Sequence, residues 1–236
     1  MTPALTTDRP RRTGVAETEL APVDKRAQRR EARQAQNRSD ILDAAEQVFG
    51  EDGPQNGSLR RIAALSGFSP AGIYLFFENK QHLLLETMTR RGDEWTGIMR
   101  DAGKGDDDPM EMLHRIVDLA VDFFAKHPYF RLLLRHVDRG ATMTESAGDI
   151  GGHYLEVVTQ IDHIVTRGQE MGQIRAGGGR ALSHLYSVLV NEFVLLDAAG
   201  PSTAANGISI GQFHELIDGA FRVIQKSTFT ERKRAR

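Results

Sequence analysis

Apolar residues recur at helical spacing along nearly the whole chain from about residue 30 onward, and no segment alternates apolar and polar positions as a strand does. The first stripe contains Ile41, Ala45 and Val48, and it ends near the Gly53-Pro54 pair, which breaks a helix. Similar stripes continue to the last part of the chain, with no internal repeat. This pattern predicts an all-α protein of about nine helices.

Two of the predicted helices are short and follow each other closely. Ser58 is placed to cap the first, and Gly67 closes it, because glycine readily adopts the left-handed backbone at a helix end. The pair Ser69-Pro70 caps and begins the second. Two short helices joined by a tight turn are what a helix-turn-helix requires.

The pattern also predicts how the chain is organised. A three-helix unit that contains the helix-turn-helix is expected over residues 33–80 and a helical bundle over residues 81–228. Residues 1–32 contain few bulky apolar residues, so we expect a disordered basic extension there, and residues 229–236 form a basic tail.

Composition and charge narrow the classes of function. The chain has no cysteine, which excludes disulfides and Cys-ligated metal sites, and no apolar run is long enough for a membrane span. No secretory signal is recognisable, so we expect a cytoplasmic protein. Residues 22–38 carry six bases against two acids, whereas residues 81–225 carry thirteen bases against twenty acids. A basic segment that precedes a longer acidic region is typical of a local binding site for a polyanion, although a solvated tail has the same composition.

A block from Arg38 to Leu83 carries a specific resemblance. It consists of Arg38-x-x-Ile41-Leu42-x-Ala44-Ala45-x-x-x-Phe49, Gly53, Ile62-Ala63-x-x-x-Gly67-Phe68-Ser69-Pro70 and Ile73-Tyr74-x-Phe76-Phe77-x-Asn79-Lys80-x-x-Leu83. This block resembles the DNA-binding domain of the TetR family of repressors. Over the rest of the chain the resemblance extends only to architecture. It implies a bacterial repressor in which residues 33–80 bind DNA and residues 81–228 bind an effector and dimerise. The dimer would bind double-stranded operator DNA and lie at the nucleoid when bound.

The resemblance also implies which residues contact DNA. A hydroxyl and backbone N–H groups at Ser58 would bind a phosphate, and Tyr74 and Lys80 would contact phosphates as well. The recognition helix would open at Ser69, where the backbone comes closest to the bases. The candidate contacts are Arg38, Ser58, Arg60, Ser69, Pro70, Ala71, Gly72, Tyr74, Leu75 and Lys80.

The recognition helix departs from the family pattern because it has few polar side chains. Many relatives have Thr at the position of Gly72 and a basic, Tyr or His residue at Leu75 or Phe76. Bidentate readout of guanine by Arg or of adenine by Asn is therefore not available from this helix. Contacts to thymine methyl groups, Arg60 and the Arg-rich segment 25–38 would have to contribute more.

The bundle contains more apolar residues than a simple helical seam uses. These are either ordinary core or the lining of an effector pocket, and the resemblance favours a pocket for a small, partly apolar effector. The candidates are Trp95, Met99, Ile116, Phe123, Phe130, Tyr154, Val157, Ile161, Tyr186 and Asn191. His136, His153 and Glu192 could orient a ligand. His153 and Glu156 lie one helical turn apart, but we do not expect a metal there.

The segment 185–196 is apolar nearly all round, so it needs partners on more than one side. The family implies a dimer interface there and on the last helical stripe. The candidates are Leu189, Phe193, Leu196, Phe213, Leu216, Ile217 and Phe221. Two-fold symmetry would then predict a palindromic operator.

Other classes of function were weighed against this interpretation. An all-helical enzyme is disfavoured, because no nucleophile–base pair or metal-spaced carboxylates lie on the inward faces, and we expect no cofactor and no bound metal. A regulator or activator that acts without a ligand, under the control of a protein partner, stays open as an alternative.

Overall fold

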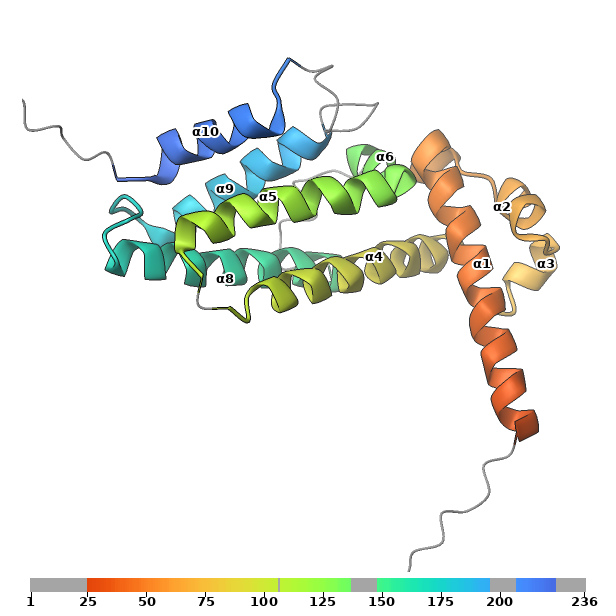
Figure 1. The fold of residues 1–236 in the computed structure, drawn as a ribbon. Coiled ribbons are helices and arrows are strands. Elements are labelled where there is room, and N and C mark those ends of the chain that lie inside the picture. Colours follow the sequence, from red (N-terminus) through yellow and green to blue (C-terminus); the bar gives the residue numbers. More distant parts are fainter. Residues whose placement is uncertain (1–24, 106, 137–147, 196–206, 224–236) are drawn as a thin grey trace, which may run out of the picture. The chain divides into compact units, whose positions relative to one another are not determined.

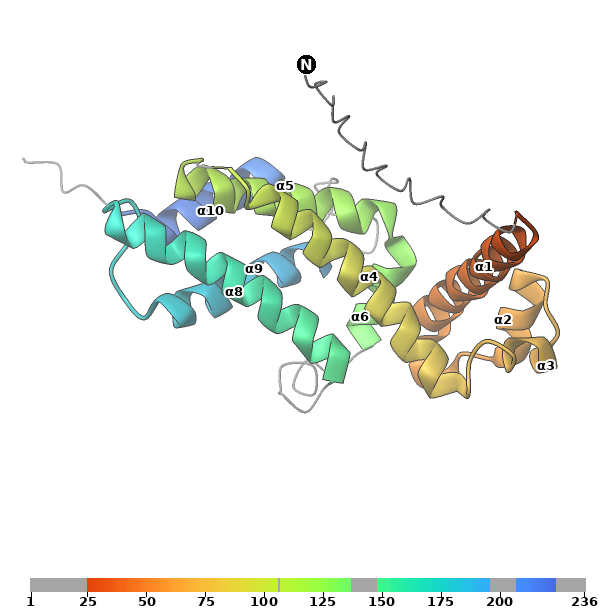
Figure 2. The same ribbon diagram turned by 90° about the horizontal axis from the view of Figure 1, so that it is seen from below.

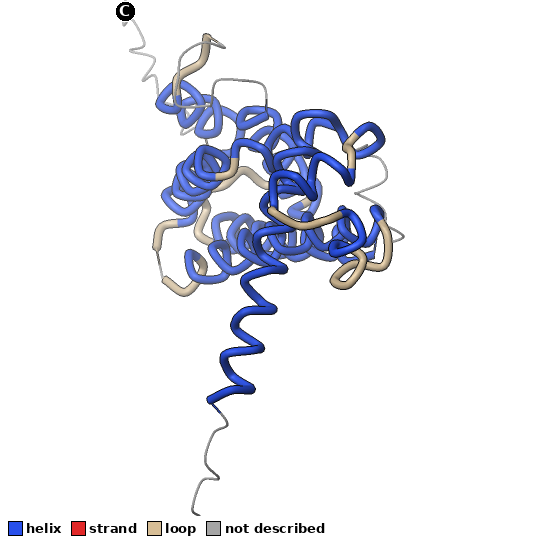
Figure 3. Tube along the Cα trace, turned by 90° about the vertical axis from the view of Figure 1, so that its right-hand side faces the viewer, coloured by secondary structure: helices blue, strands red, loops and turns tan. Residues whose placement is uncertain are grey.

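The computed structural model describes residues 25–105, 107–136, 148–195 and 207–223, and these residues form helices and loops without a strand (Figure 3). Nine helices lie within the described ranges, which confirms the all-α prediction. None of the described helices is both long and apolar enough to cross a lipid bilayer.

The chain divides into two compact units, residues 1–37 and residues 38–236. The described part of the first unit, residues 25–37, is the exposed beginning of helix α1 (Lys25–Asn56). We expected disorder as far as residue 32, and for residues 25–32 that expectation is wrong. The segment is rich in Arg, Gln, Glu and Ala, which favour helix even without a core to pack on. Residues 1–24 and the predicted tail 229–236 lie outside the described residues.

The second unit begins with the remainder of α1, followed by α2 (Leu59–Ser66) and α3 (Pro70–Ile73). A kink interrupts α1 at Gly53, whose φ of 79° suits glycine. We call residues 38–79 the head. Its buried core contains Ile41, Ala45, Phe49, Ile62, Ala63, Ile73 and Phe77. Ile41 and Ala45 belong to the first apolar stripe predicted from the sequence.

The rest of the second unit, residues 80–223, is a helical bundle that we call the body. Its helices are α4 (Lys80–Ala102), α5 (Pro109–Lys126), α6 (Pro128–His136), α8 (Gly148–Glu170), α9 (Gly179–Leu195) and α10 (Ile210–Phe221). Helix α8 packs along α4, α5 and α9, and α10 covers α5 (Figures 1 and 2). All six of these helices contribute buried apolar side chains to the core of the body.

Local capping fixes where several of these helices begin. The Asp108 carboxylate accepts hydrogen bonds from the backbone N–H groups of Met110 and Glu111 at the start of α5. Ser209 and Gln212 form the predicted capping box of α10, in which each side chain accepts a hydrogen bond from the other residue's backbone. These helix starts were readable from the sequence because each depends on residues only a few positions apart.

Candidate nucleic-acid interface and internal cavity

The turn between α2 and α3 has the geometry of a helix-turn-helix. Gly67 ends α2 with a φ of 76°, in the left-handed region that other residues rarely adopt. Ser69 caps α3, and its Oγ accepts a hydrogen bond from the Gly72 N–H at 3.0 Å. The α3 helix is only four residues long, and its inward side chain, Ile73, is buried.

The outward residues of this turn are those that the resemblance implied. Ser69, Pro70 and Ala71 are exposed, Tyr74 is 52 % exposed and Leu75 is 85 % exposed. An exposed leucine this far out of the core has no packing role in the described chain. The exposure is what a DNA contact needs, but contact itself stays a prediction.

Neighbouring residues at the start of α2 differ in what their side chains do. Ser58 and Arg60 are exposed, and the Ser58 hydroxyl does not cap its own helix. Arg61 donates a 2.7 Å hydrogen bond to Asp52 and pairs with Glu51, and these two carboxylates raise the pKa of its guanidinium. Arg61 is therefore held by the head, whereas Arg60 has no such ion pair among the described residues.

Two of the predicted DNA contacts bond other residues of this chain instead. Arg38 donates to the Phe76 carbonyl at 3.1 Å, pairs with Glu86 at 2.9 Å and lies 4.5 Å above the centroid of the Phe77 ring. Lys80 donates to the Gln55 carbonyl at 2.7 Å. These side chains stabilise the fold of the head, so their assignment as DNA contacts needs them to exchange partners.

A buried ion pair joins the head to the body, and sequence reasoning missed it. Glu46 on α1 is 5 % exposed, and its carboxylate accepts hydrogen bonds from Arg91 Nε at 2.7 Å and Arg90 Nη2 at 3.2 Å. Burial opposes the charge of Arg91, but Glu46 and Glu94 outweigh it and raise the pKa of the guanidinium. The sequence carries no signal for this pair, because its members are 45 positions apart.

Gly50 permits a second close approach between head and body. A Cβ atom at this position would lie 2.4 Å from the backbone oxygen of Tyr129 on α6. Because backbone cannot move aside as a flexible side chain can, α1 and α6 can meet here only at a glycine.

The body contains a cavity whose volume, measured to the centres of the water molecules it could hold, is about 180 Å³. Its lining comes from α4, α5, α6, α8 and α9. Nine of the ten predicted pocket residues line it, namely Trp95, Ile116, Phe123, Phe130, Tyr154, Val157, Ile161, Tyr186 and Asn191. Met99 does not; with Ile116 it lines a separate cavity that also contains Arg100 and Arg167. The arrangement supplies a mostly apolar chamber inside the bundle.

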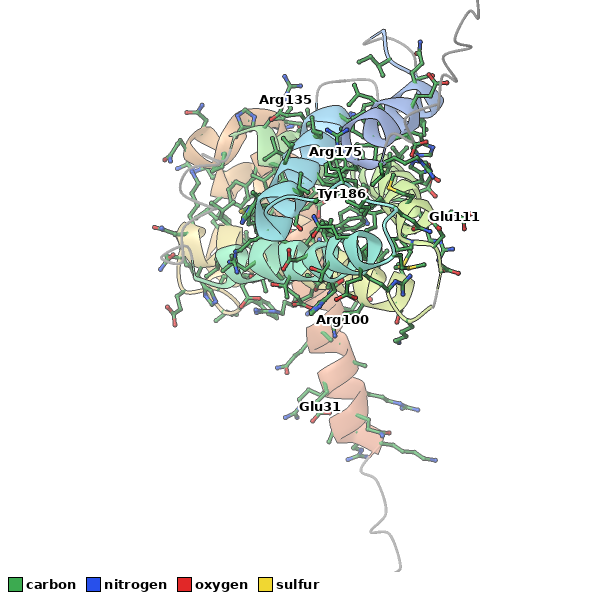
Figure 4. All side chains as sticks on the ribbon, turned by 90° about the vertical axis from the view of Figure 1, so that its left-hand side faces the viewer. Glu31, Arg100, Glu111, Arg135, Arg175 and Tyr186 are labelled. Atoms are coloured by element: carbon green, nitrogen blue, oxygen red, sulfur yellow. The ribbon has the colours of Figure 1, made fainter. Side chains whose placement is uncertain are left out.

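Most polar groups on the cavity wall already have partners. His153 Nε2 lies 2.8 Å from Asp93 Oδ1, and Tyr154 Oη lies 3.1 Å from His184 Nδ1. Tyr186, which Figure 4 places inside the bundle, donates to the Leu113 carbonyl, and burial raises its pKa well above the ordinary value.

Three other polar residues that the sequence suggested as ligand contacts or metal ligands are not part of the cavity lining. His136 does not line this cavity and instead lies beside Gly53, and Glu192 is not in the lining either. Glu156 pairs with Arg100 at 3.2 Å. His153 instead lies 2.8 Å from Asp93, so the two residues that were considered as a metal pair bond to different partners.

The predicted dimer interface needs a correction. Phe193, Phe213, Ile217 and Phe221 are all less than 5 % exposed within the single chain, and the rings of Phe193 and Phe213 stack with centroids 4.1 Å apart. These four belong to the chain's own core, so their assignment to an interface is wrong. The stripe of α10 is covered by α5 and α9, because a single chain must also bury it.

Other residues of the two helices remain at the surface. Leu216 is 43 % exposed and Leu189 is partly buried, while Leu196 lies outside the described residues. Leu185 and Val188, which were not predicted, are 48 % and 37 % exposed on α9. A helix that is apolar all round does not reveal in sequence which side faces its own core.

Comparison with known proteins supports the assignment of the head as a helix-turn-helix domain. Residues 41–87 match the family described as "Bacterial regulatory proteins, tetR family". The chain is 34 % identical over 98 residues to the HTH-type transcriptional repressor BepR of Brucella suis, a match covering 41 % of this chain and 47 % of that relative. The chain thus spans about half of this curated relative.

Solved structures share the fold over about three quarters of the chain. The transcriptional regulator FadR from Bacillus subtilis, solved with stearoyl-CoA, superposes with a TM-score of 0.62 at 21 % identity, covering 76 % of this chain and 96 % of FadR. A regulator from Saccharomonospora viridis, solved with choline, superposes with a TM-score of 0.66 at 21 % identity, covering 80 % and 100 %. Residues 41–87, which include the helix-turn-helix, thus match the TetR family of bacterial regulatory proteins, and the solved structures share the all-helical fold of the body.

Proposed function

We propose that this chain is a transcriptional repressor that binds a palindromic operator as a homodimer and releases it when a small effector enters the cavity. The observation that carries this proposal is the position of Arg91. Its side chain lines the cavity and at the same time holds Glu46 of the head through a 2.7 Å hydrogen bond. A ligand in the cavity thus touches a residue that fixes the DNA-binding head.

Operator binding is supported by the exposed surface of the head. Tyr74, Leu75 and Ala71 face outward, and their apolar atoms suit thymine methyl groups in the major groove. Ser58 and Arg60 would contact phosphates beside them. With so few polar side chains on α3, part of the affinity would come from the basic turns at the start of α1.

A homodimer is supported by the exposed leucines of the last two described helices. Leu185, Val188 and Leu216 leave apolar surface uncovered in the single chain. Pairing two copies through this surface would present two recognition helices to successive major grooves, roughly 34 Å apart. The interface would be made by these residues and Leu189, not by the aromatic stripe that the sequence pattern suggested.

Effector control would follow from a difference in affinity between two states of the bundle. FadR was solved with stearoyl-CoA, which carries a long apolar acyl chain, so an effector with a substantial apolar part is consistent with this fold and with this cavity's lining. An effector that displaced Arg91 would weaken its bond to Glu46. The head would then be free to change its position relative to its partner's head.

Selection from a random DNA library, followed by footprinting, tests the first half of the proposal. We expect an inverted repeat whose half-sites are about one helical turn apart. Recovery of a single asymmetric site, or of no preferred sequence, would overturn it. The alternative, a regulator without a ligand, predicts that the complex with the selected DNA is insensitive to every ligand that binds the cavity.

A further inference from the structure

The cavity contains a buried hydroxyl to which no other described residue bonds. Ser187 on α9 lines the cavity and is 4 % exposed, and its Oγ has no hydrogen-bond partner among the described residues. A buried hydroxyl without a partner loses its hydration and gains nothing in return. Its position on a cavity wall points to a partner that comes from outside the chain.

Two other buried hydroxyls in the described helices, those of Ser183 and Thr87, are satisfied in the way usual for helices, whereas the Thr89 hydroxyl, which does not line this cavity, is not. Ser183, one turn earlier on the same helix, donates to the Gly179 carbonyl at 2.9 Å and lies 3.1 Å from Asp162 Oδ1. Thr87 on α4 donates to the Leu83 carbonyl at 2.7 Å. Helical Ser and Thr can bond backbone in this manner. Ser187 therefore differs from two close counterparts in the same fold.

The charged groups around the cavity leave little for an ionised ligand. Arg91 is held by Glu46 and Glu94, and His153 by Asp93. An ionised group entering the apolar interior would lose its hydration without finding a free countercharge on this wall.

A neutral polar group finds a better site. Asn191 lies four residues after Ser187 on α9 and lines the same cavity, so the two side chains share one helix face. The Ser187 hydroxyl can donate a hydrogen bond, and the Asn191 amide can donate or accept one. Aromatic surface is supplied by Trp95 and Phe123, whose ring centroids are 5.3 Å apart.

We propose that Ser187 is a specificity-determining residue of the cavity, and that it selects an effector whose buried portion is an apolar chain bearing an uncharged acceptor. An ester, thioester, amide or ketone carbonyl has this chemistry. The carbonyl oxygen accepts a hydrogen bond from Ser187 and the chain packs on the aromatic residues. This inference rests on the proposed function, because it assumes that the cavity receives the effector.

The single tryptophan of the chain allows a direct test, because Trp95 lines the cavity and its fluorescence reports binding there. Four probes of equal chain length separate the chemistries: methyl octanoate, octanoate, octylamine and octane. The full-length protein should bind methyl octanoate more tightly than the other three. Ser187→Ala should lose about tenfold in affinity for methyl octanoate, the effect of one hydrogen bond, and nothing for octane.

Ser183→Ala is the matched control, because it removes a buried serine hydroxyl that does not line the cavity. It should keep the preference for the ester. The proposal is overturned if no probe binds, if octanoate binds better than its ester, or if Ser187→Ala binds the ester as the unaltered protein does. If Ser187 governs binding but no probe changes the affinity for selected DNA, this inference stands and effector-controlled repression fails.

Discussion

The head and the body of this protein are both helical, but the head leaves apolar side chains exposed at its surface, whereas the body encloses a cavity. In the head, short elements bury a small core and leave Tyr74 and Leu75 outside, where a second molecule can reach them. In the body, long helices leave a space inside and hold an unused hydroxyl, that of Ser187, on its wall. Both regions have incomplete interactions, one at the surface and one in the interior. This difference predicts separate effects for substitutions in the two regions.

The largest effect is expected where the two regions meet. Glu46→Gln removes a carboxylate that is nearly buried between Arg90 and Arg91, so we expect it to lower the free energy of unfolding by about 3 kcal/mol in urea denaturation. Trp95 should still report probe binding, while DNA affinity loses its dependence on the probe. Glu94→Gln is the control, because that carboxylate is 39 % exposed and its loss should cost less than about 1 kcal/mol. Equal losses from the two variants would show that burial of Glu46 is unimportant.

Deletion of residues 1–32 should have the next largest effect, confined to the head. We expect DNA affinity to fall about a hundredfold at low salt and the slope of log affinity against log salt to decrease by about 2 to 4, as phosphate contacts are lost. Binding isotherms at several salt concentrations measure both. Deletion of residues 1–24 alone keeps the bases of α1 and separates their contribution. An unchanged salt slope would remove any role for the extension in binding DNA.

Two adjacent arginines give a finer comparison within the head. Arg60→Ala should weaken DNA binding about tenfold, because its side chain is exposed and not ion-paired among the described residues. Arg61→Ala should change DNA affinity much less, since Asp52 and Glu51 already hold that guanidinium. Electrophoretic mobility shifts on the selected operator measure both. The reverse order would mean that the Arg61 ion pairs open when DNA binds.

The smallest effect should be confined to the body. Asp108→Ala removes the cap of α5 and should lower the free energy of unfolding by about 1 kcal/mol at pH 7. Burial opposes the charge of Asp108, but hydrogen bonds from the Glu111 and Met110 N–H groups and from Gln173 outweigh it and lower its pKa.

The pH dependence of that effect follows from the lowered pKa. The stabilisation is complete above the ordinary pKa of a carboxyl group and is lost as pH falls through the lower folded value. The difference between Asp108→Ala and the unaltered protein should therefore shrink below about pH 4 in denaturation experiments. A constant difference down to pH 2 would contradict the assignment. Asp122→Ala serves as the control, because Asp122 is an exposed carboxylate on the same helix that does not cap it.

The sequence by itself determined the local parts of this protein. Ser69-Pro70, Gly67 and the Ser209–Gln212 box fixed helix ends, because capping and turn geometry depend on residues within a few positions of each other. The apolar period predicted the helices, and together with the resemblance it pointed to most residues of the cavity lining. Many residues of the block from Arg38 to Leu83, which resembles the TetR family, lie at these apolar positions.

Only the tertiary structure decided which side chains already have hydrogen-bond, ion-pair or stacking partners within the chain. Arg38 and Lys80 resemble DNA contacts in sequence, yet they bond the head itself, and Phe193 and Phe213 stack on each other within one chain. The pairing of Glu46 with Arg91 and the unpartnered hydroxyl of Ser187 were equally invisible. The physical reason is that helical period places a residue on a face, but hydrogen bonds, ion pairs and burial depend on which distant face it meets after folding.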